Sequence, residues 1–146
     1  MLLTLLLGAA LMAGPTQAAT SNGPYYAEPA WDQKLPVATR FIVLTDWSSQ
    51  AVLDRETGLV WEQAPQLTQK DWIGARLVCT ERITGGRKGW RLPSVHELAS
   101  LMDPSVASPG PTLPPGHPFI SFQIFTYWSA TTNAQFSLEA WLVNFI

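Results

Sequence analysis

The sequence predicts an α+β fold with an antiparallel sheet, two helices and long loops. Two observations predict it. Segments rich in β-branched and aromatic residues stand before and after the predicted helices and do not alternate with them. Two helical patterns with end signals stand together in the middle. The 146 residues are 47% hydrophobic and 11% aromatic, which is enough for one domain with a packed core.

The first residues have the features of a secretory signal peptide. Residues 2–12 form an apolar run too short to span a bilayer comfortably, and a Gly-Pro pair follows it. Small residues at Thr16 and Ala18 suit a signal peptidase. We therefore expect cleavage of residues 1–18, with no integral membrane span afterwards, and a secreted, periplasmic or envelope location. A short membrane anchor is the alternative, because no Lys or Arg precedes the apolar run.

Residues 19–38 are polar, contain three prolines and show no period, so we expect a flexible tether. The domain itself is then expected to span residues 39–146. Its first strand is predicted from Phe41 to Thr45, where the residues are aromatic and β-branched.

Residues 51–63 have the pattern of a β-hairpin. Asp54 can accept a hydrogen bond from its own turn backbone, and Gly58 can take the positive φ that closes the turn. Val52 would then face Trp61 and its neighbours across the turn.

Residues 67–83 predict a helix. Thr68 is the expected N-cap, and Asp71 would place negative charge in the first turn. The predicted apolar face consists of Trp72, Ala75, Val78, Cys79 and Ile83.

A second, shorter helix is predicted after Pro93, which tolerates a position just before a helix. Ser94 and Glu97 form the S-x-x-E capping-box pattern. The expected buried face consists of Val95, Leu98, Leu101 and Met102. Residues 103–118 contain six prolines and predict an extended surface loop. Two further strands are predicted within residues 122–132 and 139–146.

Five sequence blocks, in order, resemble the Lcl C-terminal domain family, a bacterial domain of unknown function: DRETGLVWEQ, DWIGARLVC, GGRKGWRLPSVHELASLMD, YWSATT and AWLVNF. The resemblance spans about Ala51 to Phe145. It implies a C-type-lectin-like fold and an exported protein, and the family's namesake domain binds glycans and host surface components. The residues that carry the structural motif are Gly58, Trp61, Trp72, Cys79, Trp90, Arg91, Leu92, Pro93, Ser94, Glu97, Leu98, Trp128 and Trp141.

The chain departs from the family pattern at its end. Family members commonly continue beyond the AWLVNF block with a turn and a closing strand that bears a cysteine. The resemblance implies that this cysteine would pair with Cys79, the single cysteine of this sequence. We therefore expect an incomplete domain whose closing strand is missing.

Arg91 stands between two large apolar residues, just before a predicted helix. We expect Trp90 and Leu92 to be buried, and the Arg91 guanidinium to bond backbone carbonyls or a carboxylate inside the fold. A structural role is favoured over ligand binding, and Arg91→Ala is expected to lower stability.

Four cations, Arg82, Arg87, Lys88 and Arg91, lie close together in the sequence. Arg87 and Lys88 are candidates for an anionic-ligand patch, and the alternative is a solvated loop. The net charge of -2 provides no general basis for nucleic-acid binding.

Trp128 and Ser129 are candidates for a sugar-stacking surface, with core packing as the alternative. Strand alternation would place Tyr127 and Ser129 on one face and Trp128 on the other.

No motif for catalysis, a metal or a cofactor is found. His96 and His117 are the two histidines, and neither has a metal ligand at useful spacing. Asn144 stands alone where a calcium-dependent lectin would have clustered oxygens. We expect no metal site, no cofactor and no enzyme activity.

The predicted function is an exported, non-catalytic binding or adhesion module with a glycan or a cell-surface protein as ligand. One alternative is an enzyme-related domain of the formylglycine-generating type, although those relatives rely on a pair of cysteines. The other is a non-functional truncated remnant.

Overall fold

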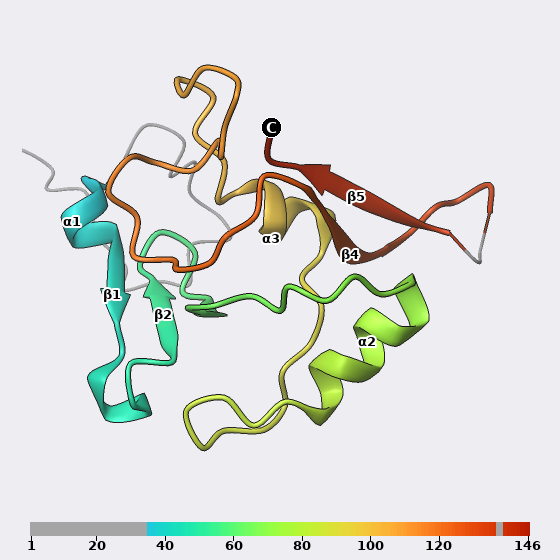
Figure 1. Ribbon diagram of the computed structural model, residues 1–146, viewed down its shortest axis with the longest axis horizontal. Helices are drawn as coiled ribbons and strands as arrows, with labels where there is room; N and C mark the ends of the chain where they lie inside the picture. The colour runs from blue at the N-terminus through green and yellow to red at the C-terminus, as the bar shows by residue number, and fades with distance from the viewer. Residues whose placement is uncertain (1–34, 137–138) are drawn as a thin grey trace, which may run out of the picture.

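The computed structural model describes residues 35–136 and 139–146, and confirms an α+β fold with antiparallel strands and few helices (Figure 1). The strands form one sheet of order β1-β2-β3 and a separate pair, β4-β5. The predicted signal peptide, residues 1–18, and most of the predicted tether lie outside the described residues. No helix in the described part of the chain is long and apolar enough to cross a membrane.

The first sheet is built from short strands near the start of the described chain. The bounds are α1 Val37–Arg40, β1 Phe41–Val43, β2 Ala51–Asp54 and β3 Val60–Glu62. A short 3₁₀ turn, η2 (Thr45–Trp47), ends the predicted first strand two residues early. The end of the predicted tether is structured, because α1 begins at Val37 and Val37 packs against the core.

The predicted hairpin is confirmed. Val52 lies opposite Trp61, and Leu53 opposite Val60. Asp54 Oδ1 accepts a hydrogen bond from the Glu56 amide at 3.0 Å, and Gly58 takes a φ of +71°. A side chain at Gly58 would be strained in this left-handed conformation.

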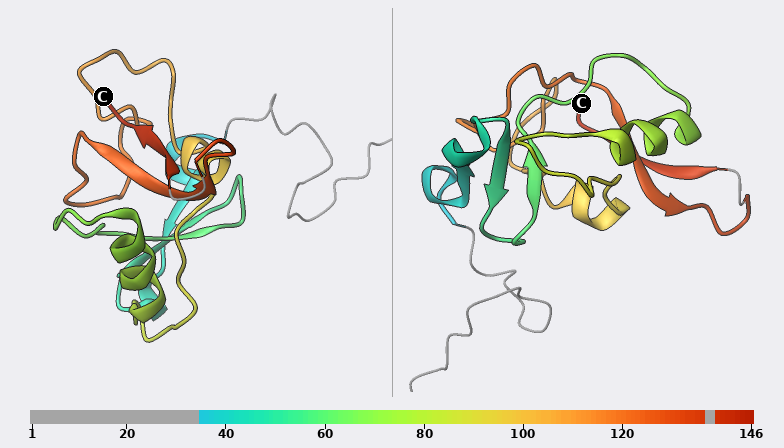
Figure 2. Two further views of the ribbon diagram at one scale, coloured as in Figure 1. Left: turned by 90° about the vertical axis from the view of Figure 1, so that its right-hand side faces the viewer. Right: turned by 90° about the horizontal axis from the view of Figure 1, so that it is seen from below.

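The second sheet pairs β4 (Thr126–Thr132) with β5 (Ala140–Asn144), with an irregularity between Trp128 and Thr132. This hairpin extends away from the three-stranded sheet, and α2 lies below it in Figure 1. In the right-hand view of Figure 2, the three-stranded sheet lies on one side of the domain and the β4-β5 hairpin on the other.

Helix α2 spans Trp72–Glu81, which is shorter than predicted at both ends. Thr68 is not its N-cap. Asp71 is the N-cap, since its side chain accepts a hydrogen bond from the Gly74 amide at 2.8 Å. The helix begins at the residue whose carboxylate can satisfy a free first-turn amide.

Helix α3 spans Val95–Ala99, and its predicted capping box is present. Ser94 Oγ accepts from the Glu97 amide at 3.2 Å, and Glu97 Oε2 accepts from the Ser94 amide at 2.8 Å. Leu98 and Leu101 are buried as predicted.

The proline-rich segment 103–118 is a loop, as predicted, but only part of it lies at the surface: residues 104–105 and 107–109 are exposed, whereas Asp103 and residues 112–114 are buried. Leu113 is 2% exposed and belongs to the core. The Thr112 amide donates to the Phe145 carbonyl at 3.1 Å, and the Asp103 amide donates to the Thr112 carbonyl at 2.7 Å. The loop therefore packs alongside the end of β5 and supplies an apolar side chain to the interior.

The core joins both sheets, α3 and the proline loop. Phe145 is fully buried and contacts Phe122 and Tyr127 edge-on, with ring centroids 5.0 and 5.6 Å apart. Phe122 and Tyr127 stack on each other at 4.9 Å. The buried residues of the core cluster are Phe41, Val52, Leu98, Leu101, Leu113, Phe119, Val143 and Phe145.

Candidate functional site

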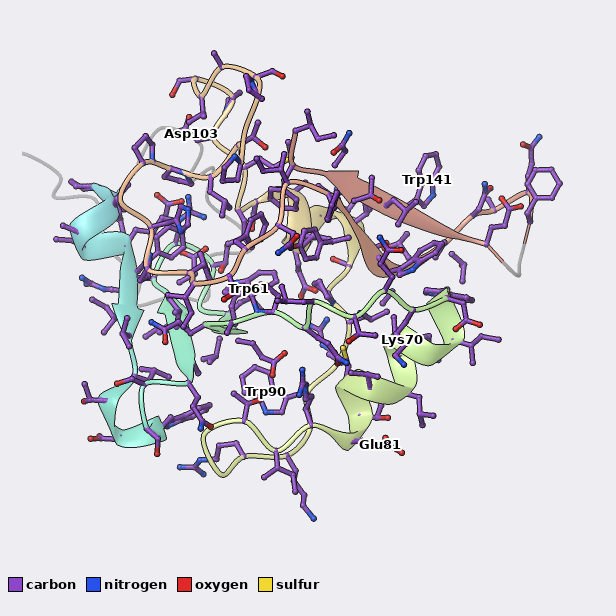
Figure 3. The ribbon with its side chains drawn as sticks, viewed as in Figure 1. Trp61, Lys70, Glu81, Trp90, Asp103 and Trp141 are labelled. Atoms are coloured by element: carbon purple, nitrogen blue, oxygen red, sulfur yellow. The ribbon has the colours of Figure 1, made fainter. Side chains whose placement is uncertain are left out.

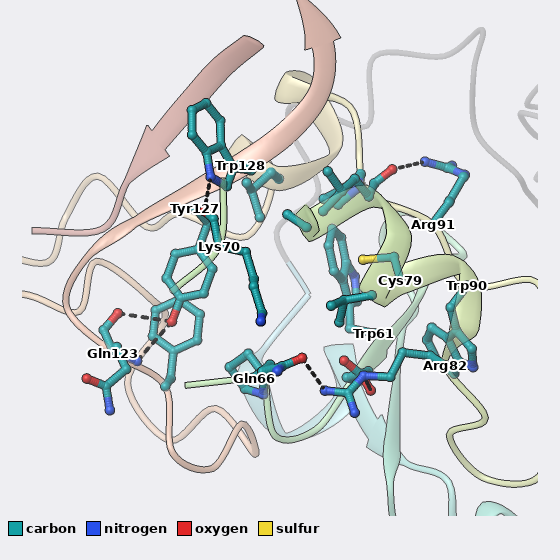
Figure 4. Close-up of a pocket in the computed structure, with 18 of the residues that line it drawn as sticks. Trp61, Gln66, Lys70, Cys79, Arg82, Trp90, Arg91, Gln123, Tyr127 and Trp128 are labelled. Atoms are coloured by element: carbon teal, nitrogen blue, oxygen red, sulfur yellow. Dashed lines mark hydrogen bonds and ion pairs between the residues drawn. The ribbon is translucent and has the colours of Figure 1, made fainter. Parts of the chain in front are cut away.

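A cavity of about 650 Å³ lies between α2, β3 and β4 (Figure 4). We call it the α2–β4 cavity. Its volume falls within the range of roughly 300–1,000 Å³ that is usual for ligand pockets. Side chains from α2, β3, β4 and the segment before α3 line it, so it forms only when distant parts of the chain come together.

The interior of the α2–β4 cavity is apolar. Ala75, Val78 and Cys79 of α2 form one wall, and Leu98 and Phe122 stand on the core side. The apolar face that was predicted for this helix is therefore only half-buried. Its last predicted member, Ile83, lies beyond the end of α2 and is 59% exposed. The helix borders a cavity instead of packing tightly on the core.

Trp61 gives the cavity a free hydrogen-bond donor. Its side chain points into the cavity in Figure 4. Its indole Nε1 is buried and has no hydrogen-bond partner among the described residues. A buried donor without an acceptor is costly, and a ligand oxygen would satisfy it.

Charged side chains stand at the mouth of the cavity. Arg82 is held by Glu62, with Nε 3.3 Å from Oε1, and donates to Gln66 Oε1 at 3.2 Å. Lys70 lines the cavity and is exposed, and its ammonium has no ion-pair or hydrogen-bond partner in the described part of the chain. The mouth therefore carries one uncompensated positive charge.

Two tryptophans join α2 to β4 beside the cavity. Trp72 Nε1 donates to the Ser129 carbonyl at 3.0 Å, and Trp128 Nε1 donates to the Lys70 carbonyl at 2.9 Å. Both bonds satisfy an indole N–H that would otherwise be partly desolvated. They hold the helix at a fixed place against the strand while leaving the cavity open.

Cys79 is the thiol of the cavity wall. Burial raises the pKa of the Cys79 thiol, and the nearby Glu62 charge raises it further. The thiol is unpaired in the described residues. It is therefore mainly protonated at neutral pH and is a poor nucleophile.

Arg91 bonds a carboxylate, as predicted, but at the surface and not inside the fold. Its side chain is 60% exposed, and its Nη1 and Nη2 lie 2.8 and 2.7 Å from the two Glu97 oxygens. Nη1 also donates to the Leu92 carbonyl at 3.1 Å. A guanidinium can meet a carboxylate in this bidentate way without burial. Trp90 and Leu92 are half-buried, whereas both were expected to be buried.

The four neighbouring cations do not form one patch. Arg82 and Arg91 are each paired with a glutamate. Arg87 lies over the Trp47 ring at 5.2 Å, and Lys88 is exposed. Trp47 also meets Trp90 edge-on at 6.4 Å, so Arg87 helps to cover a small aromatic cluster.

Of the two sugar-stacking candidates, Trp128 lines the α2–β4 cavity and Ser129 does not. Ser129 is fully buried on the core face of β4, where no surface ligand reaches its side chain. Trp141, expected in the structural motif, is 54% exposed on β5 (Figure 3).

Neither His96 nor His117 belongs to a group of metal-ligating side chains in the described residues. No group of three or more His, Cys, Asp and Glu side chains that could hold a metal occurs among residues 35–136 and 139–146. His117 packs near Phe119 and Phe122, and burial lowers its pKa.

Several residues of this site were not predicted from the sequence. Lys70 lies in the segment predicted to be helical, Gln66 lies between the predicted hairpin and that helix, and Tyr127 was assigned only to a strand face. One signal in the sequence could have indicated Lys70 and Gln66. If Asp71 had been chosen as the N-cap of α2, the residues before it would have been predicted as a loop, and a loop can border a cavity.

Comparison with known proteins supports the family prediction. The family model of the Lcl C-terminal domain matches residues 50–146. No curated protein and no solved structure matches the chain. The matched segment contains β2, β3, α2, β4 and the WRLP segment, residues 90–93. It covers more than half of the sequence. The chain belongs to the Lcl C-terminal domain family.

Proposed function

We propose that the chain is an exported, non-catalytic binding module of C-type-lectin-like architecture, whose ligand enters the α2–β4 cavity. The observation that carries this proposal is the cavity itself, which combines an apolar interior with the unpartnered Trp61 indole N–H and the free Lys70 ammonium. Apolar pockets with a few convergent polar groups are typical of binding sites.

Several features favour binding over catalysis. The sequence has one cysteine, so it cannot supply a cysteine pair. The Cys79 pKa is raised, which disfavours the reactive thiolate. The Glu97 carboxylate is already occupied by Arg91 and by the capping box. The Glu97 carboxylate therefore has structural partners, and the Cys79 thiol is disfavoured as a nucleophile.

A cavity-blocking variant tests the proposal. Val78→Trp would fill the cavity from α2, and Leu77→Trp is its matched control because Leu77 is 55% exposed on the same helix. Both proteins and the wild type are applied to a glycan array and to immobilised matrix proteins. We expect a ligand that the wild type and Leu77→Trp bind and that Val78→Trp does not. Equal binding by all three proteins would exclude the cavity as the binding site.

Export is tested separately by the intact mass of the protein recovered from its native host. Cleavage within the predicted signal peptide gives a mature chain that begins near Ala19. Recovery of the unprocessed chain in the cytoplasm would contradict the exported location.

A further inference from the structure

The α2–β4 cavity is bordered by the edges of two strands. Consecutive residues of β3 and its turn, 59–62, line it, and so do consecutive residues 125–128 around the start of β4. Successive side chains of a strand point to opposite faces of a sheet. A cavity over one face of a sheet would contact only alternate residues of a strand. Because this cavity contacts consecutive residues, it adjoins the edge of each strand, where backbone N–H and C=O groups lie.

The β3 edge facing the cavity is unpaired. The Asp54 amide donates to the Leu59 carbonyl, and the Gln63 amide donates to the Gln50 carbonyl. Hydrogen-bonded and non-bonded pairs alternate along an antiparallel ladder, so the backbone of Trp61 is directed to β2. The N–H and C=O groups of Val60 and Glu62 are then directed away from β2.

The β4 edge is unpaired in the same way. The Phe145 amide donates to the Phe125 carbonyl at 3.2 Å, and Tyr127 lies opposite Val143. By the same alternation, Thr126 and Trp128 direct their backbone groups away from β5. The Ala130 amide on this edge is covered, since it donates to the Pro93 carbonyl at 2.7 Å.

No hydrogen bond from the backbone amides of Val60, Glu62, Thr126 or Trp128 is found among residues 35–136 and 139–146. Unpaired strand edges are templates for pairing with a further strand. A ligand that enters the cavity displaces water from these backbone groups, which is costly unless the ligand pairs with them. A small apolar molecule would fill the volume and leave these groups unsatisfied. An extended polypeptide would fill the volume and pair with them.

We propose that the α2–β4 cavity takes a β-strand contributed by another polypeptide chain, with apolar side chains on both faces and an acidic residue at one end. The apolar requirement follows from the walls, which are Ala75 and Val78 on the α2 side and Leu98 and Phe122 on the core side. The acidic residue follows from charge complementarity with the free Lys70 ammonium at the mouth. This inference rests on the proposed function and names the chemical class of its ligand.

The probe is a fluorescein-labelled peptide of sequence SSVIVVEE, with its acidic residues at one end, and its binding is measured by fluorescence polarisation. The first comparison leaves the protein unchanged: the same peptide with alternate backbone amides N-methylated keeps the side chains and loses the donors. We expect the N-methylated peptide to bind at least about tenfold more weakly, from the loss of backbone hydrogen bonds. Equal binding of both peptides would overturn the inference.

The second comparison changes the protein edges. Val60→Pro and Thr126→Pro each remove an outward amide and leave the existing ladder intact, since edge strands tolerate proline at such positions. Asn144→Pro is the matched control, because it removes an outward amide from the far edge of β5. We expect roughly tenfold weaker binding for the first two and wild-type binding for the control. Lys70→Glu should weaken binding, and the loss should shrink as salt is raised.

Outcomes for the inference and for the proposed function are distinguishable. If Val78→Trp abolishes binding of a glycan while the peptide never binds, the cavity is a ligand site but not a strand site. If the full exported protein does not bind the peptide and sediments as a dimer that Val60→Pro dissociates, a second copy of the chain occupies the β3 edge. If it does not bind the peptide and sediments as a monomer, the β3 edge is already paired within one polypeptide. Each of these results overturns the proposed partner.

Discussion

Arg40 and Asp54 form a buried ion pair that joins the end of α1 to the end of β2. Arg40 Nε lies 3.0 Å from Asp54 Oδ1, and Nη2 lies 2.8 Å from Oδ2. The two side chains are 4% and 0% exposed. Arg40 also donates to the Ser100 carbonyl at 2.8 Å and lies 2.9 Å from Glu56 Oε2. One guanidinium thus links the first sheet to α3.

Removing one partner of this pair is expected to be strongly destabilising. Asp54→Ala leaves the Arg40 charge buried with fewer partners, and we expect a loss of about 3–5 kcal/mol in the free energy of unfolding. Urea denaturation measures it. Arg55→Ala is the matched control on an exposed neighbour and should change stability by less than about 0.5 kcal/mol. A loss below about 1 kcal/mol for Asp54→Ala would show that the pair is not structural.

The Arg91–Glu97 pair predicts a pH dependence. The pKa of Glu97 is lowered to about 2, mainly by the hydrogen bond from Arg91; burial opposes this shift, and the bonds with Ser94 and the Arg91 charge add to it. Because the folded pKa lies below the ordinary value of 4.5, the stabilisation is present above that value and is lost as pH falls toward about 2.

Arg91→Met keeps the apolar stem and removes the charge. We expect it to lower stability near neutral pH by about 1 kcal/mol or less, because the pair is exposed. The difference from wild type should shrink as pH falls below about 4. Urea denaturation across this pH range measures it, and a difference that is constant with pH would contradict the assigned role of Glu97.

The start of α2 is tested by two substitutions. Asp71→Ala removes the side chain that caps Gly74, and we expect a loss of about 1 kcal/mol. Thr68→Ala should change stability by less than about 0.5 kcal/mol, because Thr68 lies outside the helix. Thermal denaturation of both variants compares the two caps directly, and the reverse order would place the cap at Thr68.

The indole bond from α2 to β4 is tested by Trp72→Phe. This change keeps most of the ring and leaves the Ser129 carbonyl without its donor, so we expect a loss of about 1 kcal/mol or more. Trp141→Phe makes the same change at a residue that is 54% exposed and should be nearly neutral. Chemical denaturation of the pair is the measurement, and equal losses would indicate a general effect of removing an indole.

Cys79 provides a chemical probe of the cavity. Because burial raises its pKa, we expect slow alkylation in the folded protein and fast alkylation in urea. Intact mass spectrometry after timed exposure to iodoacetamide follows the reaction. Peptide bound in the α2–β4 cavity should slow it further, and an unchanged rate would place the peptide elsewhere.

Local features of the fold were predictable from the sequence because their causes are local. The turn after Asp54 depends on Gly58, four residues away, and the capping box depends on Ser94 and Glu97, three residues apart. The family blocks likewise identified the Lcl C-terminal domain over residues 50–146. The α2 cap was predicted three residues early, because Thr68 and Asp71 are both good N-caps and only the observed backbone distinguishes them.

The sequence by itself determined the family, the α+β class, the hairpin and the second helix start, since each follows from residues within one turn or one strand. Only the tertiary structure decided the Arg40–Asp54 pair, the burial of Leu113 in the proline-rich loop, and the cavity between α2 and β4. These features depend on contacts between segments far apart in the chain. Such contacts depend on how the apolar faces and strand edges of different elements pack against one another. A local pattern of residues does not specify that packing.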